Sequence, residues 1–481
     1  MKLDSSTLLP ALLIAAFGGM ASAQTPAAAQ TPPKPPEYPP HTKVLEGFEK
    51  VVSTSDGAKS FYTLYLRKKD GQLYAELPKD FARQRHFIAL TVASGESYAG
   101  LQAGDGVYYW REYNKRLALI EPNLETKSSG DPQSKSSVSR LFTDKVLIDV
   151  PIITKVPKGG PLIDLDALLV ESASKFFGSR AAGLNSRLFR VVTAKAFPQN
   201  IEVGFEVPMK DGQLRTLHYS ISLLPSADPK SSGYTPRLAD ERVGFFTTSY
   251  VDFGKFTENE TRVRYINRWN LQKADPNLKL SPPKQPIVFY IEHTTPIRYR
   301  RWVREGVLMW NKAFEKIGLI NAIEVRQQDA ASKAYMDLDP EDVRYNFVRW
   351  LSNGKGTAIG PSRVHPETGQ ILDADIILTD GWIRHWWTQY NEILPKVAVE
   401  GLAPETMEWL AEHPEWDPRL LLTEPRQRAS LRAKLASTSE PAHPLLSLPN
   451  AEDPLLGSHE LDGLLGRRSP VSYTHLRAHE T

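Results

Sequence analysis

The sequence predicts an α+β protein of several domains, β-rich over most of its length and α/β in its last part. Alternating apolar and polar runs, broken by turns such as Asp70-Gly71, recur from residue 44 to 285 and indicate strands joined in hairpins. A proline-rich break follows at 275–286. Beyond it, residues 298–319 repeat apolar side chains at spacings of three and four, which predicts an amphipathic helix over a sheet.

The N-terminal residues have the composition of a secretory signal. Lys2 precedes an apolar run, and Ala21-Ser22-Ala23 forms a small-x-small cleavage site. We therefore expect residues 1–23 to be a signal peptide and 24–43 to be an extended Pro-rich linker. The mature protein is expected to be periplasmic or secreted after cleavage near Ala23, with no later membrane span.

Composition excludes several classes of site. The chain has no cysteine, which rules out disulfides, thiolate nucleophiles and Cys-ligated metals, so that His and carboxylates must hold any metal. The net charge of +3 gives no broad basic field, so we expect no nucleic-acid partner.

The strand patterns divide the rest of the chain into three regions. Residues 44–160 form one β-rich domain and residues 161–285 a second, which opens with a short helical stretch. Residues 286–468 form an α/β domain, in which a buried-type strand at 286–292 is followed by the long helix.

The helix at 298–319 has predicted signals at both ends. Thr295 should cap its N-terminus, with Pro296 at the first helical position, and Gly318 should adopt a left-handed conformation at its C-terminus. Its apolar stripe is expected to face the core, and includes Trp302, Met309 and Trp310.

Several long blocks of the chain resemble one protein family. In order along the chain they are "RVGFFTTSYVDFG", "RYINRWNLQK", "PIVFYIEHTTP", "VREGVLMWNKAFEKIGLINAIEV", "DLDPEDVRYNFVRW" and "GPSRVHPETGQILDADIIL". Together they resemble the large secreted bacterial zinc-dependent metalloproteases, in which β-rich domains of unknown function precede a metzincin-like catalytic domain. The resemblance implies that 286–380 is the N-terminal half of such a catalytic domain.

The resemblance also implies a substrate-binding strand and a zinc site. A protein or peptide substrate would add to an edge strand near 371–378 through backbone hydrogen bonds. The residues implied are Leu372, Asp373, Ala374, Asp375, Ile376 and Ile377. A helix bearing H-E-x-x-H-x-x-G-x-x-H should follow, with a zinc-bound water as the nucleophile.

The zinc motif is absent from this sequence. No H-E-x-x-H occurs in it, so we assign no catalytic residue and no metal ligand to this chain, and expect zinc only in the full-length protein. The end of the sequence, "PVSYTHLRAHET", resembles a translated sequencing adaptor, so that 469–481 is expected to be a non-native tail on a truncated chain. Natural loss of the motif is the alternative.

Other short patterns carry weaker alternatives. The acidic run from Asp337 to Asp342 could help to bind calcium, or could be a turn with solvated acids. Residues 354–357 are glycine-rich, and a turn explains them better than a phosphate loop. His293 and His365 lack a partner histidine at ligand spacing, whereas His385 could pack or could line a specificity wall.

The sequence thus supports two functional hypotheses. The first is a secreted zinc metalloendopeptidase, present here as an inactive and aggregation-prone fragment. The second is a non-enzymatic secreted protein of the same origin that binds or inhibits a partner.

Overall fold

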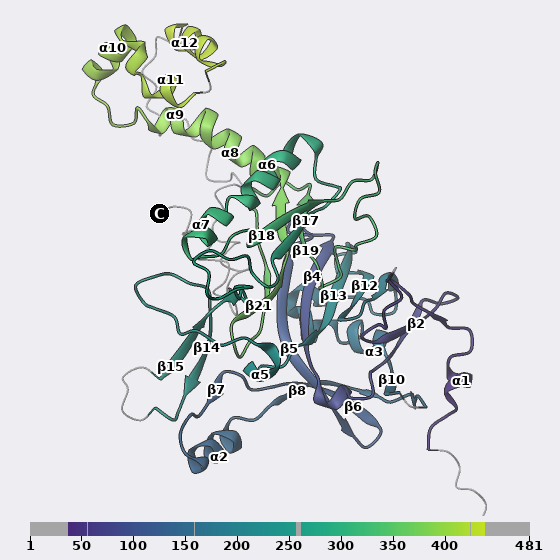
Figure 1. Ribbon diagram of the computed structural model, residues 1–481. Coiled ribbons are helices and arrows are strands. Elements are labelled where there is room, and N and C mark those ends of the chain that lie inside the picture. The colour runs from purple at the N-terminus through teal and green to yellow at the C-terminus, as the bar shows by residue number, and fades with distance from the viewer. Residues whose placement is uncertain (1–36, 55, 158, 256–260, 424, 438–481) are drawn as a thin grey trace, which may run out of the picture. The chain divides into compact units, whose positions relative to one another are not determined.

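The computed structural model of the chain describes residues 37–437, apart from 55, 158, 256–260 and 424 (Figure 1). About 24% of the chain is helix and 34% is strand, arranged with several β-sheets, so the predicted mixed α and β class is confirmed. Every element below belongs to one compact unit that begins at Pro39. The predicted signal peptide, most of the linker and the tail at 469–481 lie outside the described residues.

A seven-stranded antiparallel sheet is the largest element of the fold. Its order is β11-β12-β13-β4-β5-β6-β8, and the hairpin predicted at Asn114 joins β5 to β6 with that residue at a positive φ of 52°. The strands are β11 (Arg190–Ala196), β12 (Asn200–Pro208), β13 (Leu214–Leu224), β4 (Arg85–Ser94), β5 (Gln102–Tyr113), β6 (Arg116–Glu121) and β8 (Lys145–Pro151).

A five-stranded antiparallel sheet, β1-β2-β3-β10-β9, is formed from the N-terminal segment. Asp70-Gly71 makes the β2–β3 turn as predicted, since Arg67 pairs with Gln72 and Gly71 has a φ of 76°. Its strands are β1 (Glu49–Lys50), β2 (Thr63–Arg67), β3 (Gln72–Glu76), β10 (Pro161–Asp164) and β9 (Thr154–Lys155).

The predicted division at residues 160 and 161 does not separate two sheets. Strands β4 to β8 come from the first predicted β-rich region and β11 to β13 from the second, yet β13 pairs with β4 over nine residue pairs from Thr216–Ser94 to Leu224–Arg85. Strand β10 likewise returns to β3. The sequence could not reveal this arrangement, because non-local pairing leaves no local signal.

Short helices close one face of the seven-stranded sheet. Helices α3 (Leu165–Leu169) and α4 (Ala173–Phe177) fall within the helical stretch predicted after residue 160. The buried Tyr219 of β13 donates its hydroxyl to the Leu169 carbonyl at 2.6 Å and meets the Phe177 ring edge-on. This face is therefore the apolar side of the sheet.

Two three-stranded sheets connect the large sheet to the rest of the chain. The first has the order β15-β14-β7 and the second β16-β21-β20. The strands are β15 (Arg262–Ile266), β14 (Thr247–Asp252), β7 (Thr126–Lys127), β16 (Arg268–Trp269), β21 (Gln370–Ala374) and β20 (Ser362–Val364).

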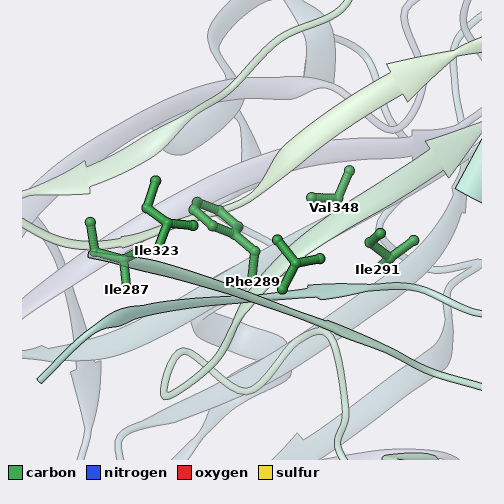
Figure 2. Close-up of a cluster of buried hydrophobic side chains, with 6 residues drawn as sticks. Ile287, Phe289, Ile291, Ile323 and Val348 are labelled. Carbon is green, nitrogen blue, oxygen red and sulfur yellow. The ribbon is translucent and has the colours of Figure 1, made fainter. Parts of the chain in front are cut away.

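A four-stranded parallel sheet, β18-β17-β19-β22, forms the α/β layer. Its strands are β18 (Ile323–Gln327), β17 (Ile287–Ile291), β19 (Asn346–Leu351) and β22 (Ile376–Thr379). Figure 2 shows the aliphatic and aromatic side chains of β17, β18 and β19 gathered in one cluster, with Ile291 fully buried. Burial of such side chains stabilises the layer by about 1.5–3 kcal/mol each.

The helix over this sheet differs from the prediction in two respects. It is divided into α6 (Ile297–Leu308) and α7 (Asn311–Lys316), and it begins after Pro296, so that the Thr295 hydroxyl makes no cap. That buried hydroxyl has no hydrogen-bond partner among the described residues. The predicted C-terminal cap is confirmed, since Gly318 has a φ of 89° and the Leu319 amide donates to the Phe314 carbonyl at 3.0 Å.

The prediction that Trp302, Met309 and Trp310 lie in the core is wrong, because each is 62% exposed. Val303, Val307 and Leu308 pack on the sheet together with Phe314, which shares the predicted spacing of three and four. Polar anchors explain this orientation: Arg304 donates to the Val325 carbonyl at 3.0 Å, and the Asn311 side chain bonds the backbone of Ile323 at 2.9 Å in both directions. These bonds fix the helices against β18, the edge of the sheet.

The remaining helices are short. They are α1 (His41–Val44), α2 (Pro132–Leu141), α5 (Pro229–Ser232), α8 (Asp380–Thr388), α9 (Leu394–Val397), α10 (Pro404–Glu412), α11 (Pro418–Leu422) and α12 (Arg428–Ser437). Four single-turn elements are η1 (Phe81–Arg83), η2 (Gly178–Ala181), η3 (Gln389–Ile393) and η4 (Pro414–Trp416). Within the described ranges, no helix combines the length and apolar character that a bilayer span requires.

Candidate functional site

The predicted substrate-binding segment is divided between two strands. Leu372, Asp373 and Ala374 lie in β21, which pairs with β20 and β16, whereas Ile376 and Ile377 lie in β22. Asp375 connects the two strands. The segment therefore changes sheets at Asp375 rather than running as one edge.

Strand β22 is the last strand of the parallel sheet, and part of its outer edge is covered. Ile377 donates its amide to the Ile359 carbonyl at 2.7 Å and accepts from the Ile359 amide at 3.0 Å. A peptide that adds to β22 at this position has to displace residue 359. The strand leads directly into α8. The Thr379 hydroxyl caps the N-terminus of this helix by accepting a hydrogen bond from the Trp382 amide at 3.1 Å.

The two aspartates of this segment point into the protein and bind its own groups. Asp373 pairs with Arg363, which also donates to the Leu223 carbonyl of β13 at 3.2 Å. Asp375 accepts the Phe347 amide at 2.8 Å. Burial raises the pKa of Asp375 to about 7, opposed by that hydrogen bond and by Arg349. These carboxyl groups position β21 and β22 and are not presented to a substrate.

The layer beneath these aspartates is the polar face of the seven-stranded sheet. Side chains alternate along β12 and β13, so Ile201 and Tyr219 face the apolar side, whereas Asn200, Glu202 and His218 face the α/β layer. Arg85 of β4 also pairs with Glu367 on this side. This face of the large sheet thus combines charged groups with an apolar cluster, in which Phe87 and Leu224 pack with Leu372 of β21.

One group on this interface brings together three side chains suited to a metal ion, Glu202, His218 and Glu341. One ligand atom of each lies within 4.8 Å of the others. The Nε2 atom of His218 is 2.7 Å from Oε2 of Glu202. Burial raises the pKa of Glu202 and lowers that of His218, and their mutual contact opposes both effects; for His218 the contact prevails and its pKa is raised overall.

The acidic run proposed for calcium is divided among different partners. Asp339 pairs with Lys195 at 2.7 Å and Asp342 pairs with Arg344 at 2.7 Å, whereas Asp337 is exposed. Glu341 alone of this run joins the three-ligand group among the described residues. The structure therefore favours a turn with paired acids over a calcium loop.

The histidines considered from the sequence lie in separate surroundings. His365 is buried, with Nε2 3.1 Å from the Pro225 carbonyl and Nδ1 accepting the Glu367 amide. His293 is exposed, and His385 contacts the Trp386 ring edge-on. His385 also packs on the glycine-rich turn, since a Cβ at Gly356 would lie 2.8 Å from the His385 Cβ. The turn therefore serves the packing of α8.

Sequence reasoning passed over the Glu202, His218 and Glu341 group. The hairpin turn between β12 and β13 could have placed Glu202 and His218 on one face, because Glu202 pairs with Ser220, two residues along. Glu341 arrives from a distant loop, and nothing in the local sequence indicates that approach.

Comparison with known protein families gives a match that covers part of the candidate site. Residues 100–274 match a family described as a domain of unknown function (DUF5117). The matched residues include Glu202 and His218, whereas Glu341 lies beyond them. No curated protein and no solved structure matches the chain.

Proposed function

We propose that the chain carries the β-rich and substrate-binding parts of a secreted zinc-dependent metalloendopeptidase of the metzincin type. The sequence blocks quoted above, which occur in order from residue 242 to 378, support this proposal. The observation that carries it furthest is the parallel sheet at 287–379, with α6 packed across it and an edge strand, β22, that leads into α8.

The residues present do not fit the catalytic zinc of that family. The chain lacks H-E-x-x-H, and the described histidines that follow β20 in the chain are engaged separately: His365 in a turn, His385 against Trp386, and His413 stacked on Trp409. We therefore derive no hydrolytic step for this chain. Its proposed share of the function is to bind an extended peptide.

Peptide binding at β22 has a defined geometry. The strand's inner side is taken by β19, from Val348–Ile376 to Leu351–Thr379, so only the outer side can accept another strand. The bridge from Ile377 to residue 359 occupies part of that side. A peptide would exchange those two hydrogen bonds for its own, so the net gain depends on pairing at the neighbouring positions.

Hydrogen exchange can test this step directly. Adding an extended peptide at saturating concentration to the full chain should slow amide hydrogen exchange in β22 and speed it at Ile359. Ile359→Pro removes the amide that donates to the Ile377 carbonyl, and should increase peptide affinity by opening the edge. Unchanged protection at β22 with every peptide in a mixed library would refute substrate binding on this strand.

The catalytic part of the proposal needs a separate experiment. The genomic sequence that follows codon 469 should encode H-E-x-x-H within about a hundred codons if the family assignment is right. A protein extended to include it should cleave peptides and lose that activity with a chelator. Activity that persists after metal removal would contradict a zinc mechanism.

A non-enzymatic binding function is the second candidate, and an exposed apolar stripe favours it. Trp302, Met309, Trp310 and Ile317 lie on the outer side of α6, α7 and the turns that follow them, and each is more than 60% exposed. Exposed apolar patches of this kind mark interaction surfaces or aggregation sites. A genuine stop codon near residue 469 in the native gene, with a folded monomeric product, would favour this candidate over the peptidase.

A further inference from the structure

We infer that Glu202, His218 and Glu341 bind a divalent transition metal of the zinc class at the interface between the seven-stranded sheet and the α/β layer. Imidazole nitrogen and carboxylate oxygen are both ligands of Zn²⁺, and one imidazole with two carboxylates favours such an ion over calcium. This inference is independent of the proposed peptidase activity.

The geometry of the three side chains suits a single ion. Bonds of about 2.0–2.2 Å from zinc to nitrogen and oxygen place tetrahedral ligand atoms about 3.3 Å apart. His218 Nε2 and Glu202 Oε2 are 2.7 Å apart, and the ligand atoms of all three residues lie within 4.8 Å of one another. Small side-chain rotations would bring all three ligand atoms to coordination distance from one ion.

A buried amide holds two members of the group in place. Asn200 is fully buried and donates from Nδ2 to Oε1 of Glu202 at 2.6 Å and to the Glu341 carbonyl at 2.7 Å. Its Oδ1 accepts the Val343 amide at 3.3 Å. Asn200 thus orients one oxygen of Glu202, leaves Oε2 for an ion, and fixes the loop that carries Glu341, as second-shell groups do in metal sites.

The charge around the group also favours a cation. Two further charged groups act on members of this group: Asp339 adds negative charge, and Arg349 adds positive charge. Lys195 is the other permanent cation. The three carboxyl groups of Glu202, Glu341 and Asp339 outnumber the two permanent cations, and a divalent ion bound to neutral His218 would compensate the excess negative charge in this partly buried layer.

Lys195 is the natural competitor for the ion. Its ammonium lies 2.8 Å from Oε2 of Glu341 and 2.7 Å from Oδ2 of Asp339. Lys195 donates a hydrogen bond to Oδ2 of Asp339 in addition to its ion pair with Glu341. Asp339 can therefore retain Lys195 when Glu341 turns to a metal.

The site would act as a clamp. Glu202 and His218 lie on β12 and β13, and Glu341 precedes β19 of the parallel sheet, so one ion ties the two sheets together. The expected consequence is a protein whose loop at 337–342 resists proteolysis with zinc and is cleaved faster after chelation.

Metal binding to the full chain tests the inference. Titration with ZnCl₂ should give one site per chain, and Co²⁺ should give the visible absorption of a tetrahedral N/O site. His218→Gln and Glu341→Gln should each weaken zinc binding at least about 100-fold, by the loss of one ligand. Lys195→Met should tighten binding, because it removes the competing ammonium.

The controls separate this site from incidental binding and from misfolding. His293→Gln changes an exposed histidine outside the group and should leave the zinc affinity unchanged. Glu341→Gln affects a partly exposed side chain, so it decides the matter if His218→Gln does not fold. The inference is overturned if the wild type binds no zinc stoichiometrically, if both ligand variants bind it as before, or if Ca²⁺ competes equally with Zn²⁺.

Discussion

Acidification should destabilise the protein through His86, which lies in β4 of the seven-stranded sheet. The side chain is fully buried, with the Phe61 and Tyr62 rings at 5.4 Å and 5.7 Å from the imidazole. Burial lowers the pKa of His86 to about 4, and the backbone of Tyr108 on β5 opposes this only in part. Because burial outweighs that backbone contact, the neutral form of the imidazole is strongly favoured.

The magnitude follows from linkage. The unfolded chain binds the proton near pH 6.5, whereas the folded chain binds it only near pH 4, so the stabilisation is present above pH 6.5 and is lost as the pH falls. At 1.36 kcal/mol per pKa unit, the free energy of unfolding should fall by about 3 kcal/mol between pH 7 and pH 4 from this one residue.

Urea unfolding at a series of pH values measures this loss. His86→Leu removes the titrating group, so its free energy of unfolding should fall by about 3 kcal/mol less than that of the wild type over the same range. His293→Leu changes an exposed histidine and provides the matched control, with the wild-type pH dependence expected. Parallel pH profiles for wild type and His86→Leu would refute the reasoning, whatever the variant's stability at pH 7.

Three further predictions concern the α/β layer. Burial raises the pKa of Asp375 to about 7, so ionisation of this carboxyl group lowers the stability of the fold as the pH rises from about 4 to 7. In urea unfolding at pH 8, Asp375→Asn should therefore raise the free energy of unfolding by up to about 4 kcal/mol. An unchanged free energy of unfolding would contradict the cost assigned to burial. Ile291→Ala should lower the free energy of unfolding by about 2–5 kcal/mol, because Ile291 is fully buried. Ile297→Ala changes an 81% exposed side chain and should alter the free energy of unfolding by less than about 0.5 kcal/mol. Equal effects of the two variants would disprove the packing described. Trp302→Ser with Trp310→Ser should reduce self-association in light scattering without lowering the melting temperature, and a large loss of stability would mean that these side chains are packed.

Local patterns determined the parts of this protein that depend on neighbouring residues. The turns at Asp70-Gly71 and Asn114 require residues that accept positive φ, and both hairpins form where the sequence predicts them. Gly318 ends its helix for the same reason. The periodicity of apolar residues also predicts the change, after residue 286, from successive strands to a strand, a helix and a further strand.

Tertiary structure alone decided which elements meet. The seven-stranded sheet joins strands from both predicted β-rich regions, because pairing between β13 and β4 depends on complementary faces and not on nearby residues. Trp302, Met309 and Trp310, which periodicity assigned to the core, are exposed, since Arg304 and Asn311 bind the edge strand and turn another face of the helix inward. Glu341 reaches Glu202 and His218 only when the α/β layer closes over the polar face of the sheet, so the candidate metal group exists only in the folded protein.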